Sequence, residues 1–160
     1  MSRKSFPNPN VIQQNFNQGI LVVEGSYARI TSNKIDANIK ANIALGGEKT
    51  GMTRIKYNYI ENSKSEGIFV AEGEANLIIE DNQIERNSDG IVLINSDGMV
   101  RYNQIKLNAR SGVLTAGKTI ATLFDNTIED SSTGVLIKDP PKLPLNKDEQ
   151  YLPRLRDNKI

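Results

Sequence analysis

The stretch NQIERNSDGIVL at residues 82–93 is followed by a near copy, NQIKLNARSGVL, at residues 103–114. On both sides of this pair, the motif Asn-x-Ile recurs along the whole chain in one register. Its Asn residues lie at intervals of 23, 25, 24, 21, 23 and 32 and are Asn10, Asn33, Asn58, Asn82, Asn103, Asn126 and Asn158. A repeat of this length is the signature of a solenoid, in which successive copies stack on one another.

Each repeat carries further fixed positions around its Asn. An aliphatic residue stands three positions earlier in the last six copies, and a turn former stands five positions later. About nine positions later comes a small or turn residue followed by a β-branched one, and the pairs are Gly19-Ile20, Asn42-Ile43, Gly67-Ile68, Gly90-Ile91, Gly112-Val113 and Gly134-Val135. Apolar residues alternate with other positions over three to five residues, which is the period of strands rather than helices.

Three short strands in each repeat of roughly 23 residues predict a chain wound into a coil and stacked on itself. Successive coils would lie about 4.8 Å apart and pair as parallel strands. About six such coils would enclose an all-Ile column formed by Ile12, Ile35, Ile60, Ile84, Ile105, Ile128 and Ile160. Because Asn tolerates positive φ, we expect each repeated Asn to form a left-handed bend between strands.

Composition excludes several classes of protein. The chain has 160 residues, about one domain, with no Cys and no His, so disulfide scaffolds, thiolate metal sites and histidine-based triads are ruled out. A net charge of +1 gives no support for binding nucleic acid or acidic membranes. The apolar runs are too short to span a bilayer, and residues 1–10 do not resemble a secretory signal. We therefore expect a cytoplasmic protein without cofactor or metal.

The pattern N-x-I-x-x-[NS]-x(2 to 4)-G-[IV]-x-[VL] resembles the right-handed parallel β-helix repeat of the pectate-lyase-like superfamily. The resemblance covers residues 10–138, and residues 153–160 less completely. It is most similar to the short regular repeats of eukaryotic CASH domains, as in F-box-linked β-helix proteins and SHC-binding proteins. The implied fold is an all-β, single-stranded parallel β-helix. Leucine-rich repeats are the alternative, and they would require a helical return in every copy.

The first strand of each coil is expected to present apolar side chains outward as well as inward. Its outward residues are Leu21, Val23, Ala44, Phe69, Ala71, Val92, Ile94, Leu114 and Leu136. Stacked over six coils they would form one continuous stripe, and large apolar patches on soluble proteins usually mark interfaces. We expect partner proteins to bind there. The alternative is that the chain covers the stripe itself with its N-terminal tail or its Pro-rich segment.

Charged residues follow two other outward rows. One row is mostly acidic and reads Gln13, Asp36, Glu61, Glu85, Lys106 and Glu129. The other alternates in sign and reads Thr31, Lys56, Glu80, Arg101, Phe124 and Arg156. Opposite charges on neighbouring coils pair weakly when exposed, so we interpret both rows as solvated surface.

Two fragments resemble polygalacturonase motifs, namely NSDG at residues 87–90 and RIK at residues 54–56. The G-H-G motif of that family is missing, because the chain has no His. Glu66 and Asp89 are expected about 5 Å apart on adjacent coils, a separation that suits a retaining glycosidase. Catalysis or calcium binding by this pair is the alternative function; a pair of exposed loop acids is the interpretation we favour.

These features predict four parts: an N-terminal tail (1–9), β-helix repeats (10–138), a Pro-rich loop (139–152) and an incomplete terminal coil (153–160). An unfinished coil exposes its core and unpaired backbone groups, so we expect the ends to be capped by further chain or another subunit. The Pro-rich loop is either a linker or a recognition segment. The predicted function is a non-enzymatic protein-binding scaffold, in a cytoskeletal or ciliary assembly or in substrate recognition by a ubiquitin ligase.

Overall fold

The computed structural model describes residues 8–23, 26–47, 52–72, 76–139 and 153–160, and these form three six-stranded sheets. Sheet A contains β1 (Asn10–Gln13), β4 (Asn33–Asp36), β7 (Tyr59–Glu61), β10 (Gln83–Glu85), β13 (Gln104–Lys106) and β16 (Thr127–Glu129). Sheet B contains β2 (Ile20–Val23), β5 (Ile43–Gly46), β8 (Glu66–Ala71), β11 (Asp89–Ile94), β14 (Ser111–Ala116) and β17 (Thr133–Lys138). Sheet C contains β3 (Arg29–Thr31), β6 (Arg54–Lys56), β9 (Leu77–Glu80), β12 (Gly98–Arg101), β15 (Ala121–Phe124) and β18 (Arg154–Arg156).

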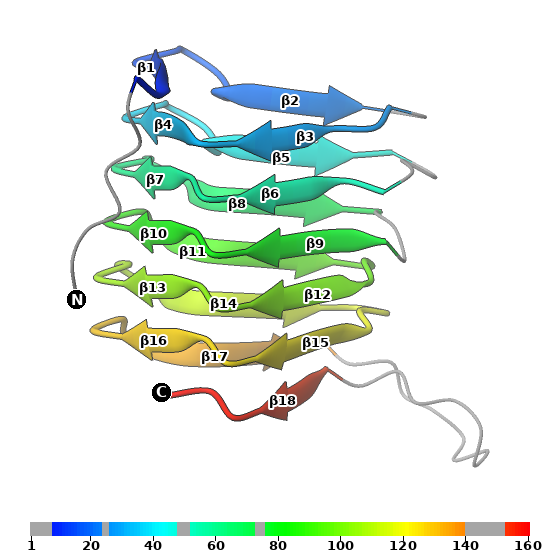
Figure 1. The fold of residues 1–160 in the computed structure, drawn as a ribbon. Coiled ribbons are helices and arrows are strands. Elements are labelled where there is room, and N and C mark those ends of the chain that lie inside the picture. The colour runs from blue at the N-terminus through cyan, green and yellow to red at the C-terminus, as the bar shows by residue number, and fades with distance from the viewer. Residues whose placement is uncertain (1–7, 24–25, 48–51, 73–75, 140–152) are drawn as a thin grey trace.

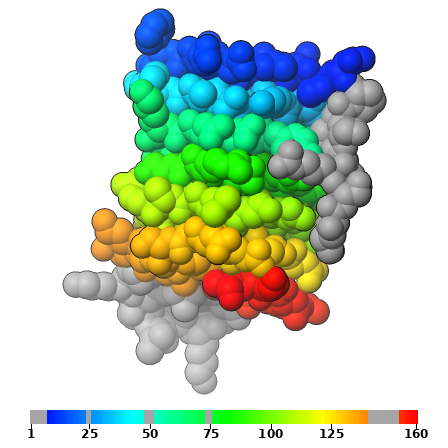
Figure 2. All heavy atoms as spheres, turned by 90° about the vertical axis from the view of Figure 1, so that its left-hand side faces the viewer, coloured from blue at the N-terminus to red at the C-terminus, as the bar shows by residue number. Residues whose placement is uncertain are grey.

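The chain visits sheets A, B and C in turn, and each strand pairs in parallel with the strand one coil away. Figure 1 shows the resulting stack of coils, with sheet C in front and sheet B behind. In Figure 2 the coils lie flush on one another as successive colour bands. The predicted parallel β-helix of about six coils, with roughly 23 residues in each, is therefore confirmed.

The described residues contain strands and turns but no helix, so the leucine-rich-repeat alternative is wrong. No helix long and apolar enough to cross a membrane is found in this part of the chain. The predicted N-terminal tail lies outside the described residues except for residues 8 and 9. The predicted Pro-rich loop likewise lies outside them except for residue 139.

The core is the predicted Ile column, together with aliphatic side chains from sheets B and C. Ile35, Ile60, Ile84 and Ile105 are 0% exposed and lie in register on neighbouring strands of sheet A. Burying one such side chain stabilises the fold by roughly 1.5–3 kcal/mol. The column opens at the C-terminal end, where Ile160 is 66% exposed.

The repeated Asn residues stack on one another, and the five from Asn33 to Asn126 are buried, which corrects the expectation that they form the bends. The backbone N–H and Nδ2 of Asn58 both donate to Oδ1 of Asn82, over 2.9 and 3.0 Å. Asn82 donates in the same way to Asn103 over 3.0 Å, and Asn103 to Asn126. Each of these amides also donates to a backbone carbonyl of the preceding coil, as Asn58 does to Ile30 over 2.8 Å, so it links its own coil to both neighbours.

The left-handed conformation belongs to the residue that precedes the Asn in the last six copies. These residues have φ between 51° and 58° and are Ser32, Tyr57, Asp81, Tyr102, Asp125 and Asp157. Because Asn must direct its amide into the stack, the bend falls on its neighbour, whose side chain is free to be Ser, Tyr or Asp. The corner between sheets C and A is thereby fixed to the same short turn in every coil.

A second polar stack lies at the corner between sheets A and B, on the positions expected as turn formers. Asn15 donates to Asn38 over 2.8 Å, and Asn87 donates to Asn108 over 3.2 Å. In the third coil the position is Ser63, which has no amide to continue the stack. Asn42 from the second coil fills this place: its Nδ2 donates to Asn87 over 3.3 Å, and its Oδ1 accepts from Asn38 over 2.6 Å.

Glycine replaces Asn42 at the equivalent position of the other coils, where a Cβ would approach atoms of the neighbouring coil too closely. A Cβ added to Gly19 would lie 2.7 Å from Nδ2 of Asn38, and one added to Gly67 would lie 2.9 Å from Nδ2 of Asn87. At position 42 the next coil carries the small Ser63, which leaves the place in the stack that the Asn42 side chain fills. The two departures from the repeat therefore compensate each other.

The corner between sheets B and C varies most in length. Residues 95–97 separate β11 from β12, whereas residues 139–153 separate β17 from β18. The flanking strands pair in the same register in both cases. The larger changes in repeat length are thus taken up at one edge of the coil.

Candidate functional site

The outward side chains of sheet B form the candidate site predicted from the sequence. The structure places six of the nine residues in one column, in register from strand to strand. This apolar row consists of Leu21, Ala44, Phe69, Val92, Leu114 and Leu136. Val23, Ala71 and Ile94 lie in a second column, which ends in the polar Lys138.

The apolar row is not a continuously exposed stripe, and this corrects the prediction. Ala44 is 4% exposed and Val92 is 5% exposed. In register, Ala44 lies between Leu21 and Phe69, and Val92 lies between Phe69 and Leu114. At a strand spacing of about 4.8 Å, larger neighbours on both sides shield a smaller side chain.

Within sheet B, the most exposed apolar side chains lie on its two edge strands. Leu21 and Val23 on β2 are 57% and 51% exposed, and Leu136 and Ile137 on β17 are 38% and 43% exposed. Phe69, Ala71, Ile94 and Leu114 are half-buried. Both β2 and β17 are edge strands, so each also has one row of backbone groups that pairs with no strand of the described chain.

Glu66 and Asp89 pair in register on β8 and β11, as predicted. Asp89 is 2% exposed rather than lying in an open loop. Its carboxylate accepts the backbone N–H of Ser111 over 3.1 Å, the Ser111 hydroxyl and the Arg110 guanidinium. Glu66 accepts a hydrogen bond of 2.6 Å from the Ser65 hydroxyl. Each acid is thus held by its own neighbours, and Asp89 faces the next coil rather than solvent.

On sheet C the alternating row forms a compact ion-pair cluster. Glu80 is 4% exposed and lies 2.9 Å from Nζ of Lys56 and 2.7 Å from Nη2 of Arg101. Burial acts to raise the pKa of Glu80, but hydrogen bonds from Lys56 and Arg101 outweigh it and leave the pKa below its usual value. The same hydrogen bond from Lys56 to Glu80 raises the pKa of Lys56. This cluster is less solvated than we expected.

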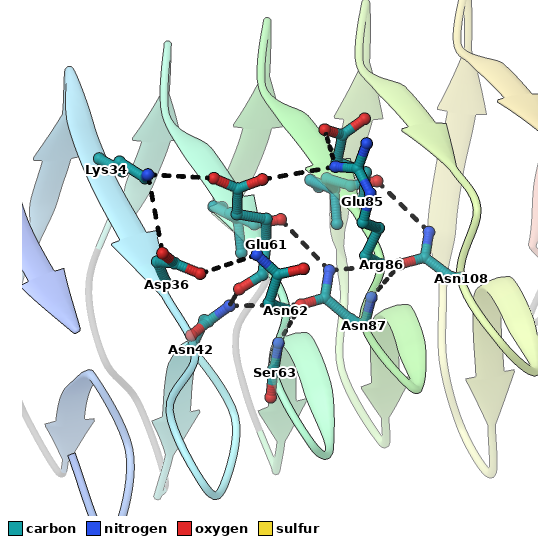
Figure 3. A network of polar contacts seen from close by, with 12 residues as sticks. Lys34, Asp36, Asn42, Glu61, Asn62, Ser63, Glu85, Arg86, Asn87 and Asn108 are labelled. Carbon is teal, nitrogen blue, oxygen red and sulfur yellow. Dashed lines mark hydrogen bonds and ion pairs between the residues drawn. The ribbon is translucent and has the colours of Figure 1, made fainter. Parts of the chain in front are cut away.

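On sheet A the acidic row is largely neutralised by bases that the sequence pattern did not single out. Nζ of Lys34 lies 3.4 Å from Glu61 and 3.6 Å from Asp36, and Arg86 pairs with Glu61 over 3.5 Å and also with Glu85. Figure 3 shows these side chains beside the second polar stack, of which Asn42, Asn87 and Asn108 are labelled. No group of acids that could hold a metal ion is found among the described residues.

Comparison with known proteins agrees with this geometry. The profile of a family described as the right-handed beta helix region matches residues 8–140. The chain belongs to this right-handed β-helix family. No curated protein and no solved structure matches the chain.

Membership in the right-handed β-helix family gives the handedness of the winding and accounts for the parallel sheets. It does not choose among functions, because enzymes and binding proteins share such folds. Within this β-helix the C-terminal end remains open in the part that the structure describes. Leu155 is 44% exposed, whereas Leu123, its partner in register one coil earlier, is 0% exposed.

Proposed function

We propose that the chain is a non-enzymatic protein–protein interaction scaffold that binds partner proteins at the ends of sheet B and along its apolar row. One observation carries the proposal: the aliphatic side chains of Leu21, Val23, Leu136 and Ile137 are exposed on the edge strands β2 and β17. An edge strand offers backbone donors and acceptors to a partner strand, and apolar side chains beside it add affinity.

The stacked Asn residues and the Ile column support a scaffolding role, because they fix the relative positions of all the coils. A partner that contacts several coils therefore meets a preorganised surface and loses little affinity to ordering it. The resemblance to CASH-type proteins favours a cytoplasmic location in a cytoskeletal or ciliary assembly, or a role in recognising substrates of a ubiquitin ligase. Further chain or another subunit would then cover the coil ends.

The arrangement of Glu66 and Asp89 supports a role without catalysis. A retaining glycosidase needs one carboxylate free to attack and another free to donate a proton. Hydrogen bonds from Ser111 and Arg110 occupy Asp89 instead. We expect no turnover of polygalacturonate, measured as new reducing ends. Turnover that falls on Glu66→Gln would reverse the proposal in favour of a carbohydrate-active enzyme.

The binding proposal is tested with single charges placed on exposed residues. Leu21→Asp and Leu136→Asp introduce a charge at either end of the apolar row, and Gln13→Asp adds the same charge on the exposed part of β1. Tagged variants are used to recover proteins from a cytosolic extract, and each recovered protein is quantified by mass spectrometry. Loss of a central apolar contact weakens binding by about 2 kcal/mol, so recovery should fall roughly tenfold or more.

We expect at least one recovered protein to depend on Leu21 or Leu136 and to be retained by Gln13→Asp. Circular dichroism first verifies that all three variants are folded. The proposal is refuted if they recover the same proteins in the same amounts as the unchanged chain.

A further inference from the structure

Two arginines lie side by side on the outward face of sheet C. Arg29 on β3 pairs in register with Arg54 on β6, so their side chains leave neighbouring strands in the same direction. Strands of one sheet lie about 4.8 Å apart. Like charges placed directly opposite each other destabilise a sheet, so this pair calls for a compensating negative charge.

The other described arginines already have partners. Arg86, Arg101, Arg110 and Arg156 each pair with a carboxylate. Arg154 also takes part in an interaction. Within the described part of the chain, the guanidinium groups of Arg29 and Arg54 have no ion pair or hydrogen bond, and Nε of Arg54 is buried without a hydrogen-bond partner. Among the described residues, the two adjacent guanidinium groups therefore have no compensating negative charge.

These arginines border a surface hollow of roughly 470 Å³, whose described lining is Tyr27, Ala28, Arg29, Met52 and Arg54. Tyr27 and Met52 are 77% and 57% exposed. Neither residue carries a charge at neutral pH, so the two guanidinium groups supply all the charge of the described lining. An aromatic ring and a thioether beside them offer an apolar surface to the rest of a ligand.

We propose that this hollow binds a phosphomonoester dianion. A phosphomonoester carries a charge of about −1.5 to −2 near neutral pH, which matches two guanidinium groups. Its three oxygens can accept hydrogen bonds from both arginines at once, in the bidentate geometry that arginine provides. A carboxylate or a phosphodiester carries a single charge and would neutralise only one of them. The site lies on sheet C and is separate from the apolar row on sheet B.

The test follows the Nε–H signals of Arg29 and Arg54 by nuclear magnetic resonance during titrations at pH 7.5. The probes are phenyl phosphate, inorganic phosphate, methyl phenyl phosphate as a monoanionic diester, and benzoate as a carboxylate. Arg29→Gln and Arg54→Gln remove one guanidinium each. Arg156→Gln is the matched control, because it removes an exposed arginine from β18, at the opposite end of the same sheet.

We expect phenyl phosphate to shift both signals with saturation, and each site variant to weaken binding roughly tenfold or more, since charge-assisted hydrogen bonds are lost. Arg156→Gln should bind as the unchanged chain does. Tighter binding of phenyl phosphate than of inorganic phosphate, with the difference removed by Tyr27→Ala, would assign a phosphorylated aromatic group. Equal binding of the two would assign free phosphate. Either result supports a dianion site.

Three results would overturn the proposal: no saturable shift, equal binding of benzoate or the diester, or site variants that bind as the control does. Acidic residues Glu24 and Glu48 lie near the arginines in sequence and outside the described residues. If Glu24→Gln or Glu48→Gln shifts the Arg54 signal in anion-free buffer, a carboxylate of the chain is the partner, and the proposal is likewise wrong.

Discussion

Exchanging the two irregular residues of the second polar stack should restore the regular repeat. Asn42→Gly removes a side chain that accepts from Asn38 and donates to Asn87 and to the carbonyl of Glu61. Each such hydrogen bond contributes about 1 kcal/mol net, and glycine in a strand region costs roughly 0.5–1 kcal/mol more. We expect this single variant to lose roughly 2–4 kcal/mol.

Ser63→Asn alone should also destabilise, for a steric reason. In regular coils Nδ2 of the stacked Asn lies 2.7–3.0 Å from the place that a Cβ would occupy on the facing glycine. An Asn at position 63 would therefore collide with Asn42, and overpacking of this kind costs about 1–3 kcal/mol.

The double variant should recover most of both losses, because the amide introduced at position 63 would then stack between Asn38 and Asn87 over a glycine. We expect a coupling free energy of about 2 kcal/mol or more in the double-mutant cycle. The assay is urea unfolding followed by circular dichroism for all four proteins, with equal m-values as the control for two-state behaviour. If the two effects add within about 0.5 kcal/mol, the compensation inferred from the structure is wrong.

Two further predictions concern buried polar groups. Thr115 is 1% exposed and its hydroxyl lacks a hydrogen-bond partner, so Thr115→Val should raise the free energy of unfolding by about 1 kcal/mol. Thr119→Val, the matched control, should lower it, because this hydroxyl donates to Ala116 over 2.6 Å; the same sign in both would contradict the assignment. The pKa of Glu80 is lowered in the folded protein, so its carboxylate should stabilise the fold relative to Glu80→Gln. This difference in the free energy of unfolding should be complete above the usual pKa of 4.5 and should shrink as the pH falls below it. Urea unfolding at pH 7 and pH 3 measures this; a difference that stays constant with pH would refute it.

The winding of the chain could be predicted from the sequence because the Ile and Asn positions repeat in one register. A position that recurs in every coil must occupy the same environment in every coil, so alignment of the repeats predicts which strands pair. The Ile column and the pairing of Glu66 with Asp89 follow from that alignment alone.

The direction of side chains at the corners did not follow from the alignment. Asn is typical both of left-handed bends and of buried stacks, and only the backbone shows that Tyr57 takes the bend while Asn58 faces inward. The exposure of the apolar row depends on the sizes of neighbouring side chains, which is why Val92 is buried. Arg29 and Arg54 do share a place in the repeat, but the near-zero net charge of the chain carries no information about local excesses of positive charge.

The uneven corners also bear on how this chain can be altered. Where sheet C meets sheet A, the bend and the Asn that follows it fit one short turn. An added residue there would turn the side chains of the following strand of sheet A to the opposite face. Where sheet B meets sheet C, the separating segment ranges from residues 95–97 to residues 139–153 while the pairing beyond it stays in step. A foreign peptide or an affinity tag is therefore best inserted at that edge, because the insertion would leave the packing between the coils intact.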